Sequence, residues 1–351
     1  MSEKTAKLAD VAKAAGVSQG TASNVFNRPE VVREEVREKV LAAARKIGYG
    51  GPDPKGRLLR AGKVNAIGIG AAEPLSYFFD DPFARTVMAS IAQECDSRGA
   101  GIALISALNN ESVAWNIQSA LVDGLILFCA EGADKLIELA RDRQIPFVAI
   151  ESPEKLGDLA TITIDNFAGG RLAAEHLVAL GHRRFGILAL PFNETGSGPR
   201  TPDEVRAALY DNIRDRALGY FSVLADQGIA EADVPLFETR DRETVFAALD
   251  TFYATAEPPT ALLCMSDVIA LDALAWLRSR GHKVPEDVSV VGFDGVPEAA
   301  LSDPPLTTIE QPLAEMGRMA VQIVMAPTRQ TGNTTADLQL VVRGSTGPAR
   351  G

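Results

Sequence analysis

The chain has 351 residues, of which 46% are hydrophobic and 23% are charged, a composition typical of a globular protein long enough for two or three domains. Residues 1–63 carry 13 Lys and Arg against 7 Asp and Glu, whereas the rest of the chain carries 22 against 39. This division indicates that the basic first segment contacts nucleic acid, while the acidic remainder is repelled by phosphate.

The N-terminus, the cysteines and the histidines exclude several classes of protein. No apolar run resembles a signal peptide or approaches the length of a membrane span. The three cysteines have no CxxC spacing, and the three histidines lie far apart in the sequence. We therefore expect a cytoplasmic protein with no metal site, no cofactor and buried thiols at Cys95, Cys129 and Cys264.

Residues 8–27 predict two short helices joined by a turn at Gly16, a residue type suited to the position after a helix C-terminus. Val11, Ala12 and Ala15 line one face of the first helix, and Ser18 is suited to cap the second. The outward face of the second helix consists of amides, a hydroxyl and glycine. These residues are Gln19, Gly20, Ser23, Asn24 and Asn27.

The outward face of this second helix predicts DNA recognition, because Gln and Asn pair with adenine in the major groove. We expect base contacts from Gln19, Gly20 and Asn24. We expect phosphate contacts, which hydroxyls and amides commonly make, from Thr21, Ser23 and Asn27. The alternative is a helical hairpin packed on a larger domain.

A third helix at about residues 33–47 and a linker at 50–63 follow. The linker contains two prolines and four glycines, but two adjacent leucines flanked by arginines have no reason to lie exposed in it.

From Lys63 onward, short apolar strands alternate with helical patterns. Strands are expected at 65–70, 101–106, 124–128, 147–150, 161–164, 185–190, 236–238, 261–265, 288–293 and about 337–343. Helices are expected at about 83–98, 111–121, 132–143, 167–180, 213–228, 242–255, 267–281 and 311–325.

This alternation predicts two doubly wound subdomains with parallel sheets covered on both faces. Such sheets bind ligands beyond the carboxyl ends of their strands. The residues selected in this way are Ser76, Tyr77, Phe79, Asp80 and Phe83 in the first subdomain and Asp267 and Asp294 in the second. Aromatic rings stack on sugars or bases, and carboxylates bind hydroxyls. Asp267 opens a helix, so its alternative role is an N-cap.

Motifs of enzymes are incomplete or missing. Gly68-Ile69-Gly70 follows the first strand, but the third glycine of a dinucleotide-binding fingerprint is absent and Glu73-Pro74 stands where a helix should begin. The sequence shows no P-loop, no HExxH motif and no nucleophile elbow between a strand and a helix. We therefore expect no NAD binding and no enzymatic activity.

Six motifs resemble, in the expected order, those of the lactose-repressor (LacI/GalR) family of bacterial transcription regulators. They are LADVAKAAGVS at 8–18, REKV at 37–40, GY at 48–49, LGHRR at 180–184, PEDVSVVGFD at 285–294 and PLTTI at 305–309. The resemblance implies an N-terminal all-α helix-turn-helix head plus an α/β body of two doubly wound parallel-sheet subdomains like those of periplasmic binding proteins. It implies a DNA-binding head at 1–50, a hinge at 51–63, an N-terminal subdomain at 64–166 and 297–326, and a C-terminal subdomain at 167–296 and 327–346.

The resemblance also assigns roles in the hinge. It implies a hinge helix that orders on DNA, with Arg57, Leu58 and Leu59 in the minor groove and Leu59 as the wedge between base steps. Gly56 stands where the family usually has alanine, so this helix is expected to be disordered without DNA. The alternative is that both leucines pack on the body.

In the body, the resemblance implies that Arg216, in the run RALGY, anchors a small-molecule effector in a cleft between the subdomains. An exposed ion pair is the alternative for Arg216. Arg240 stands where many members carry an aromatic residue, and it is a further candidate for effector binding. Residues 195–212 are longer than the usual family loop and are expected to form a flexible cover. The chain has no heptads after its last strand, so no tetramerising coiled coil is expected.

These observations predict a homodimeric repressor that binds double-stranded operator DNA and responds to a sugar or a sugar derivative. One alternative is a soluble sugar-binding receptor without a role in DNA binding, which residues 1–50 and the missing export signal oppose. A second alternative is an enzyme of similar α/β architecture, which the absence of catalytic motifs opposes.

Overall fold

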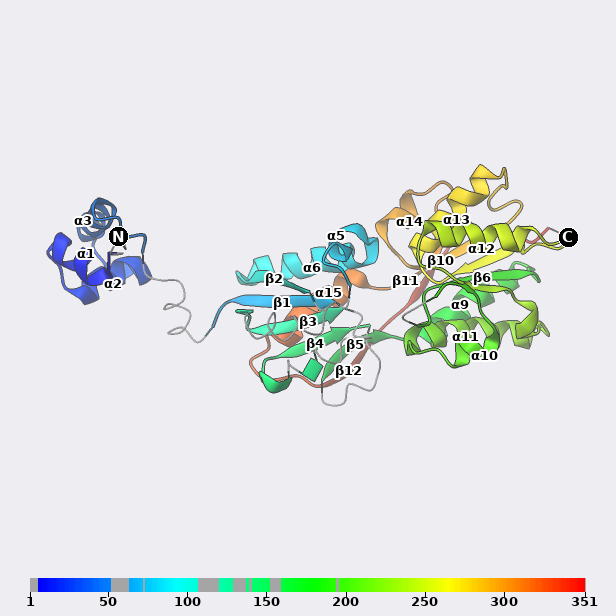
Figure 1. Ribbon diagram of the computed structural model, residues 1–351, viewed down its shortest axis with the longest axis horizontal. Coiled ribbons are helices and arrows are strands. Elements are labelled where there is room, and N and C mark those ends of the chain that lie inside the picture. The colour runs from blue at the N-terminus through cyan, green and yellow to red at the C-terminus, as the bar shows by residue number, and fades with distance from the viewer. Residues whose placement is uncertain are drawn as a thin grey trace. The chain divides into compact units, whose positions relative to one another are not determined.

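The computed structural model describes residues 6–51, 63–71, 73–106, 120–128, 137–138, 141–151, 159–193 and 196–350. The chain divides into two compact units, Met1–Val64 and Asn65–Gly351, which we call the head and the body (Figure 1). Among the described residues, no helix combines the length and the hydropathy needed to cross a membrane. The expected hinge residues Arg57, Leu58 and Leu59 lie outside the described residues, as do Cys129 and most of the expected helices at 111–121 and 132–143.

The described residues of the head form a bundle of three α-helices with one short 3-10 helix. Its elements are α1 (Leu8–Ala15), α2 (Gln19–Asn27), η1 (Pro29–Val31) and α3 (Glu34–Lys46). Gly16 has a φ of 62°, and its conformation turns the chain between α1 and α2. The Ser18 hydroxyl caps α2 by accepting the Thr21 N–H at 3.0 Å. Small and branched residues from all three helices, including Val11, Ala22 and Val40, form the core.

The first lobe of the body is built on a six-stranded parallel sheet in the order β12-β5-β4-β3-β1-β2. Its strands are β1 (Ala66–Ala71), β2 (Gly101–Ser106), β3 (Gly124–Phe128), β4 (Phe147–Ile150), β5 (Ala160–Ile164) and β12 (Gly332–Ala336). Its described helices include α5 (Tyr77–Asp80), α6 (Pro82–Arg98) and α15 (Leu313–Val324). β3, β4 and β5 are buried along their whole length, as expected for parallel strands covered on both faces.

The second lobe is built on a seven-stranded sheet in the order β13-β11-β10-β9-β6-β8-β7. Its strands are β6 (Phe185–Ala189), β7 (Gly198–Pro199), β8 (Leu236–Glu238), β9 (Ala261–Cys264), β10 (Ser289–Asp294), β11 (Thr307–Glu310) and β13 (Gln339–Val341). Its helices are α9 (Asn166–Ala179), α10 (Pro202–Arg206), α11 (Asp211–Asp226), η3 (Glu231–Asp233), α12 (Arg242–Tyr253), α13 (Asp267–Ser279) and α14 (Pro297–Leu301). The two edge strands β7 and β13 are antiparallel to their neighbours, and the inner strands are parallel.

The chain returns to the first lobe later than the sequence predicts, so the expected boundaries at 297–326 and 327–346 are wrong in part. β11 pairs with β10 in the second lobe, with Thr307 opposite Val291, and only α15 then enters the first lobe. β12 pairs with β5, so residues 332–336 belong to the first lobe and not to the second. β12 is polar and mostly exposed, and it therefore lacks the apolar pattern by which the other strands are predicted.

Candidate functional site

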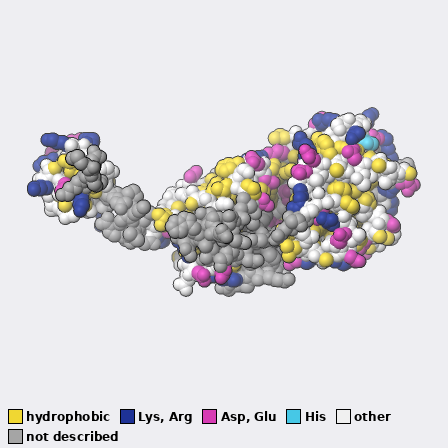
Figure 2. Space-filling view, in the orientation of Figure 1, with side chains coloured by type: hydrophobic (Ala, Val, Ile, Leu, Met, Phe, Trp, Pro, Cys, Tyr) yellow, Lys and Arg dark blue, Asp and Glu magenta, His cyan; other side chains and the backbone are white. Residues whose placement is uncertain are grey.

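The second helix of the head, α2, presents the polar face that the sequence predicts. Gln19, Gly20 and Asn24 are exposed, whereas Ala22 and Val25 are buried against the other helices. Lys and Arg side chains gather on the surface of the head (Figure 2). The exposed face of α2 thus carries side chains able to pair with bases, the head that bears it is basic, and the individual base contacts stay a prediction.

The three residues expected to contact phosphate are held by local hydrogen bonds. The Thr21 and Ser18 hydroxyl groups lie 2.9 Å apart and share a hydrogen bond. The Asn27 side-chain amide donates to the Ser23 hydroxyl at 3.1 Å. These bonds orient the side chains of Thr21, Ser23 and Asn27 in the absence of DNA, and their contacts with phosphate stay a prediction.

In the body, Arg216 of α11 is the centre of a buried polar cluster. Only 4% of it is exposed. Its Nε and Nη2 donate to Asn166 Oδ1 at 3.1 and 2.7 Å, and its Nη1 donates to the Met265 carbonyl. Its Cζ lies 3.5 Å from the centroid of the Phe293 ring. Because Arg216 is buried, the alternative of an exposed ion pair is wrong.

Two glycines allow α9 and α11 to approach closely and thereby place Arg216. A Cβ atom at Gly170 would lie 2.3 Å from the Arg216 carbonyl oxygen. A Cβ atom at Gly219 would lie 2.3 Å from the Phe167 carbonyl oxygen. Gly219 follows Arg216 by three residues, so the RALGY run supplies both the guanidinium and the close helix packing that positions it.

Asp294, the last residue of β10, lies in the same cluster. It is 8% exposed, its φ is 116°, and its Oδ1 accepts a hydrogen bond from Gln311 Nε2 at 2.9 Å. Burial raises the pKa of Asp294 well above its ordinary value, the Arg216 guanidinium opposes that rise, and the carboxyls of Asp267 and Asp81 add to it. Asp294 therefore holds its proton to a higher pH than an exposed carboxyl does.

Asp267 is fully buried at the start of α13, and its two oxygens accept hydrogen bonds from the Gly295 N–H at 2.8 Å, the Val296 N–H at 2.9 Å and the Thr308 hydroxyl at 2.6 Å. The N-cap of α13 is Ser266, whose hydroxyl accepts the Ile269 N–H, so the N-cap alternative for Asp267 is wrong. The three hydrogen bonds give Asp267 a structural role, and its contact with an effector stays a prediction.

Glu151 and Gln311 belong to the cluster and are missing from the sequence prediction. Glu151 follows β4, is 5% exposed and has a φ of 52°. Burial raises the pKa of Glu151 to about 7, although the Arg216 guanidinium and a hydrogen bond from the Asn166 side chain lower it. Glu151 directly follows the strand predicted at 147–150. A position at the carboxyl end of a strand is the signal that selected Asp294, and the same signal could have identified Glu151.

Three buried polar atoms of this region have no hydrogen-bond partner among the described residues: Glu151 Oε1, Gln311 Oε1 and the Tyr220 hydroxyl. Burial raises the pKa of Tyr220, while Arg216 lowers it and Asp294 raises it, which places its hydroxyl near both groups. Buried polar atoms are rarely left unpaired in folded proteins. We refer to Arg216, Asn166, Glu151, Asp294, Gln311 and Tyr220 as the Arg216 cluster.

The residues expected after the first strand are only partly buried. Ser76, Phe79 and Asp80 are exposed, and Tyr77 and Phe83 are half-buried against the core. Phe78, which is not among the expected site residues, is buried, and its ring lies edge-on to Phe128 with centroids 5.3 Å apart.

Asp81 is a carboxylate of the first lobe that the sequence prediction omits. Its side chain caps α6 by accepting the Ala84 N–H at 3.0 Å. The charge of Asp81 raises the pKa of Asp294 in the second lobe. Asp81, and not the exposed Asp80, is therefore the carboxylate of this segment that acts on the Arg216 cluster.

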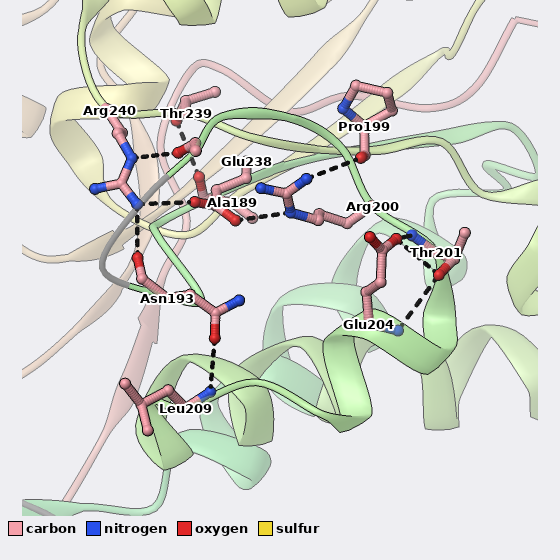
Figure 3. A network of polar contacts seen from close by, with 11 residues as sticks. Ala189, Asn193, Pro199, Arg200, Thr201, Glu204, Leu209, Glu238, Thr239 and Arg240 are labelled. Carbon is pink, nitrogen blue, oxygen red and sulfur yellow. Dashed lines mark hydrogen bonds and ion pairs between the residues drawn. The ribbon is translucent and has the colours of Figure 1, made fainter.

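Arg240 is held by a separate network at the carboxyl end of β8 (Figure 3). Its Nη2 donates to Glu238 Oε1 at 3.1 Å and to the Asn193 carbonyl at 2.6 Å. Glu238 is fully buried and also accepts from Arg200 Nε at 2.9 Å. Instead of forming a flexible cover, residues 196–212 contain β7 and the helix α10, whose start is fixed by a capping box between Thr201 and Glu204.

Comparison with known proteins identifies two family models on this chain. Residues 7–51 match the bacterial regulatory proteins of the lacI family, and residues 174–346 match a periplasmic binding protein-like domain. An HTH-type transcriptional regulator of Mycobacterium tuberculosis is 34% identical over 332 residues, which cover 93% of this chain and 92% of that relative.

Two solved structures extend the comparison to the whole fold. The lac repressor dimer bound to operator and the anti-inducer ONPF matches with a TM-score of 0.76 and 26% identity, covering 98% of this chain and 100% of that one. The complex of the transcriptional regulator CelR with cellobiose matches with a TM-score of 0.66 and 26% identity, covering 97% and 99%. The expected fold class is confirmed, and the relatives are regulators and not enzymes. The chain belongs to the lacI family of bacterial DNA-binding transcriptional regulators.

Proposed function

We propose that this regulator is a repressor that binds operator DNA as a homodimer, and that a small polyhydroxylated molecule, a sugar or a sugar derivative, controls its operator affinity. The observation that carries this proposal is the set of unpaired buried atoms around Arg216 and Asp294. The proposal is supported by the CelR complex with cellobiose and by the lac repressor dimer on its operator. A repressor acting on bacterial operators works in the cytoplasm.

The chemistry of the Arg216 cluster favours an uncharged ligand with several hydroxyl groups. Glu151 and Gln311 offer free acceptor oxygens, the Tyr220 hydroxyl can donate or accept, and Arg216 offers donors. A hydroxyl both donates and accepts, so a polyol can pair with every one of these groups. Burial raises the pKa of both Glu151 and Asp294, so the site disfavours negative charge, and an anionic ligand would meet the same desolvation penalty.

The cluster also explains how a ligand could act on both lobes. Glu151 extends from the first lobe, Arg216 and Asp294 lie in the second, and Gln311 lies between β11 of the second lobe and α15 of the first. A ligand bound to these residues contacts both lobes. It therefore changes the free energy of the arrangement in which the two lobes meet. Because binding and conformation are linked, such a ligand would change operator affinity, and operator would change ligand affinity by the same factor.

The test is a thermal-shift screen of the full chain with monosaccharides, disaccharides and linear polyols, followed by operator titration with each compound that raises the melting temperature. We expect one compound to stabilise the protein and change the operator Kd. Arg216→Ala and Asp294→Ala should each abolish this response while operator binding persists. Arg280→Ala, on the surface of the second lobe, is the control and should respond normally. A ligand that binds Arg216→Ala with unchanged affinity would contradict the proposed site.

A further inference from the structure

An ion pair joins the two lobes of the body directly. Arg85 of α6 in the first lobe donates through Nη2 to Glu298 Oε1 of α14 in the second lobe. Arg85 Nη1 also donates to the Phe79 carbonyl at 3.3 Å, so the guanidinium is held from its own lobe. In Figure 1, α6 lies beside the first sheet, and α14 lies next to α13 in the second lobe. The contact depends on the relative position of the two lobes.

The surroundings of this ion pair make its loss unfavourable to the contact between the two lobes. Burial raises the pKa of Asp81, the Arg85 guanidinium lowers it, and the Glu298 carboxylate raises it. Arg85 therefore lies close to two carboxylates, one from each lobe. Glu298 Oε2 is buried without a partner among the described residues. Without the guanidinium, Asp81 and Glu298 would repel each other, and this repulsion would separate the lobes.

We propose that Arg85 and Glu298 form a latch that holds the two lobes of the body in the arrangement that the structure shows, which we call closed. The proposal concerns the closed arrangement of the lobes, and only its effect on DNA rests on the proposed function. Both side chains of the latch are partly exposed, 46% for Arg85 and 37% for Glu298, so the pair can form and break without unfolding the core.

The experiment measures the distance between the lobes in the full chain without ligand. Spin labels are attached at Gln93→Cys of α6 and Ala247→Cys of α12, both exposed positions, in a background without the native cysteines. Arg85→Ala and Glu298→Ala should each increase the open population relative to the closed one by roughly twofold to fivefold. The double variant should be no more open than Arg85→Ala, because it also removes the repulsion between Asp81 and Glu298. The exchange of Arg85→Glu with Glu298→Arg should restore the parental distribution.

The matched control is the pair Arg280 and Asp250, which is similarly exposed but lies within the second lobe. Arg280→Ala should leave the distance distribution unchanged. Unchanged distances in Arg85→Ala and Glu298→Ala, or an exchange variant that stays open, would overturn the latch. Operator titration of the same variants separates the two proposals. Altered distances with an unaltered operator Kd would support the latch and contradict the coupling of lobe closure to DNA binding.

Discussion

Asp267 lies just after β9, and Asp294 is the last residue of the neighbouring strand β10. The Asp267 carboxylate fixes the backbone that follows Asp294. Asp267 accepts the N–H groups of Gly295 and Val296, the two residues that follow Asp294, whose φ of 116° is unusual for a residue with a side chain. Asp267 is thus a positioning residue, and Asp294 is the one that faces the Arg216 cluster.

Replacing Asp267 by Asn tests this relationship. The amide keeps one acceptor oxygen but places an N–H₂ group against backbone N–H donors or the Thr308 hydroxyl. We expect the free energy of unfolding to fall by about 1–3 kcal/mol, as measured by urea denaturation. Ligand affinity should fall with it, because the backbone at Asp294 relaxes. An unchanged unfolding free energy would show that the turn is fixed by other contacts.

Glu151 should make the stability of the body depend on pH. Its pKa in the folded protein, about 7, lies above its ordinary value of 4.5, so the folded state binds the proton more tightly than the unfolded state. The associated stability is present below pH 4.5 and is lost as the pH rises through 7, by an amount on the order of 3 kcal/mol. Denaturation at pH 5 and at pH 8 should show that the free energy of unfolding falls less with rising pH in Glu151→Gln than in the parent. Equal losses in both proteins would contradict a buried carboxyl at this position.

Gly219→Ala should disturb the packing of α9 on α11. The added methyl group would lie 2.3 Å from the Phe167 carbonyl, so the helices must separate. We expect a destabilisation of about 1–3 kcal/mol, measured by thermal denaturation, and a weaker response to ligand, because Arg216 moves with α11. Asp226→Ala, at the exposed end of the same helix, is the control. Normal stability of Gly219→Ala would mean that the two helices can move apart freely.

Asn24→Ala should reduce the discrimination between operator and mutated operator by about 1–3 kcal/mol at one base position, because Asn24 is exposed on α2. Asn27→Ala should weaken binding to all DNA sequences alike, as expected for a phosphate contact. Titrations with operator and with random DNA distinguish the two effects. Equal weakening of both DNAs by Asn24→Ala would refute its role in base recognition.

Leu301→Asp should weaken the homodimer. Leu301 is 84% exposed and Phe79 is 64% exposed, and they are the most exposed large hydrophobic residues of the described body. Arg85 bonds to Phe79 and to Glu298, three residues before Leu301, so both side chains belong to one region of the surface. Sedimentation equilibrium should show a dimer Kd raised at least roughly tenfold, because a two-fold interface loses both leucines. Leu209→Asp, which is 59% exposed elsewhere, should have no effect.

The sequence by itself determined the elements whose cause is local. The turn at Gly16, the cap at Ser18 and the apolar faces of the head lie within 40 residues, and hydrophobic runs identify most strands of the body. The rule that ligands lie beyond strand ends correctly selected Asp294 as a member of the buried polar cluster.

Only the tertiary structure decided which of these side chains meet. Arg216 bonds to Asn166 and to Met265, each about 50 residues away, and Glu151 comes to it from the other lobe. The polar strand β12 joins the first lobe because β5 pairs with it, and Asp267 turns inward because two backbone donors lie there. Such choices depend on hydrogen bonds and burial between distant segments, which periodicity along the chain does not encode.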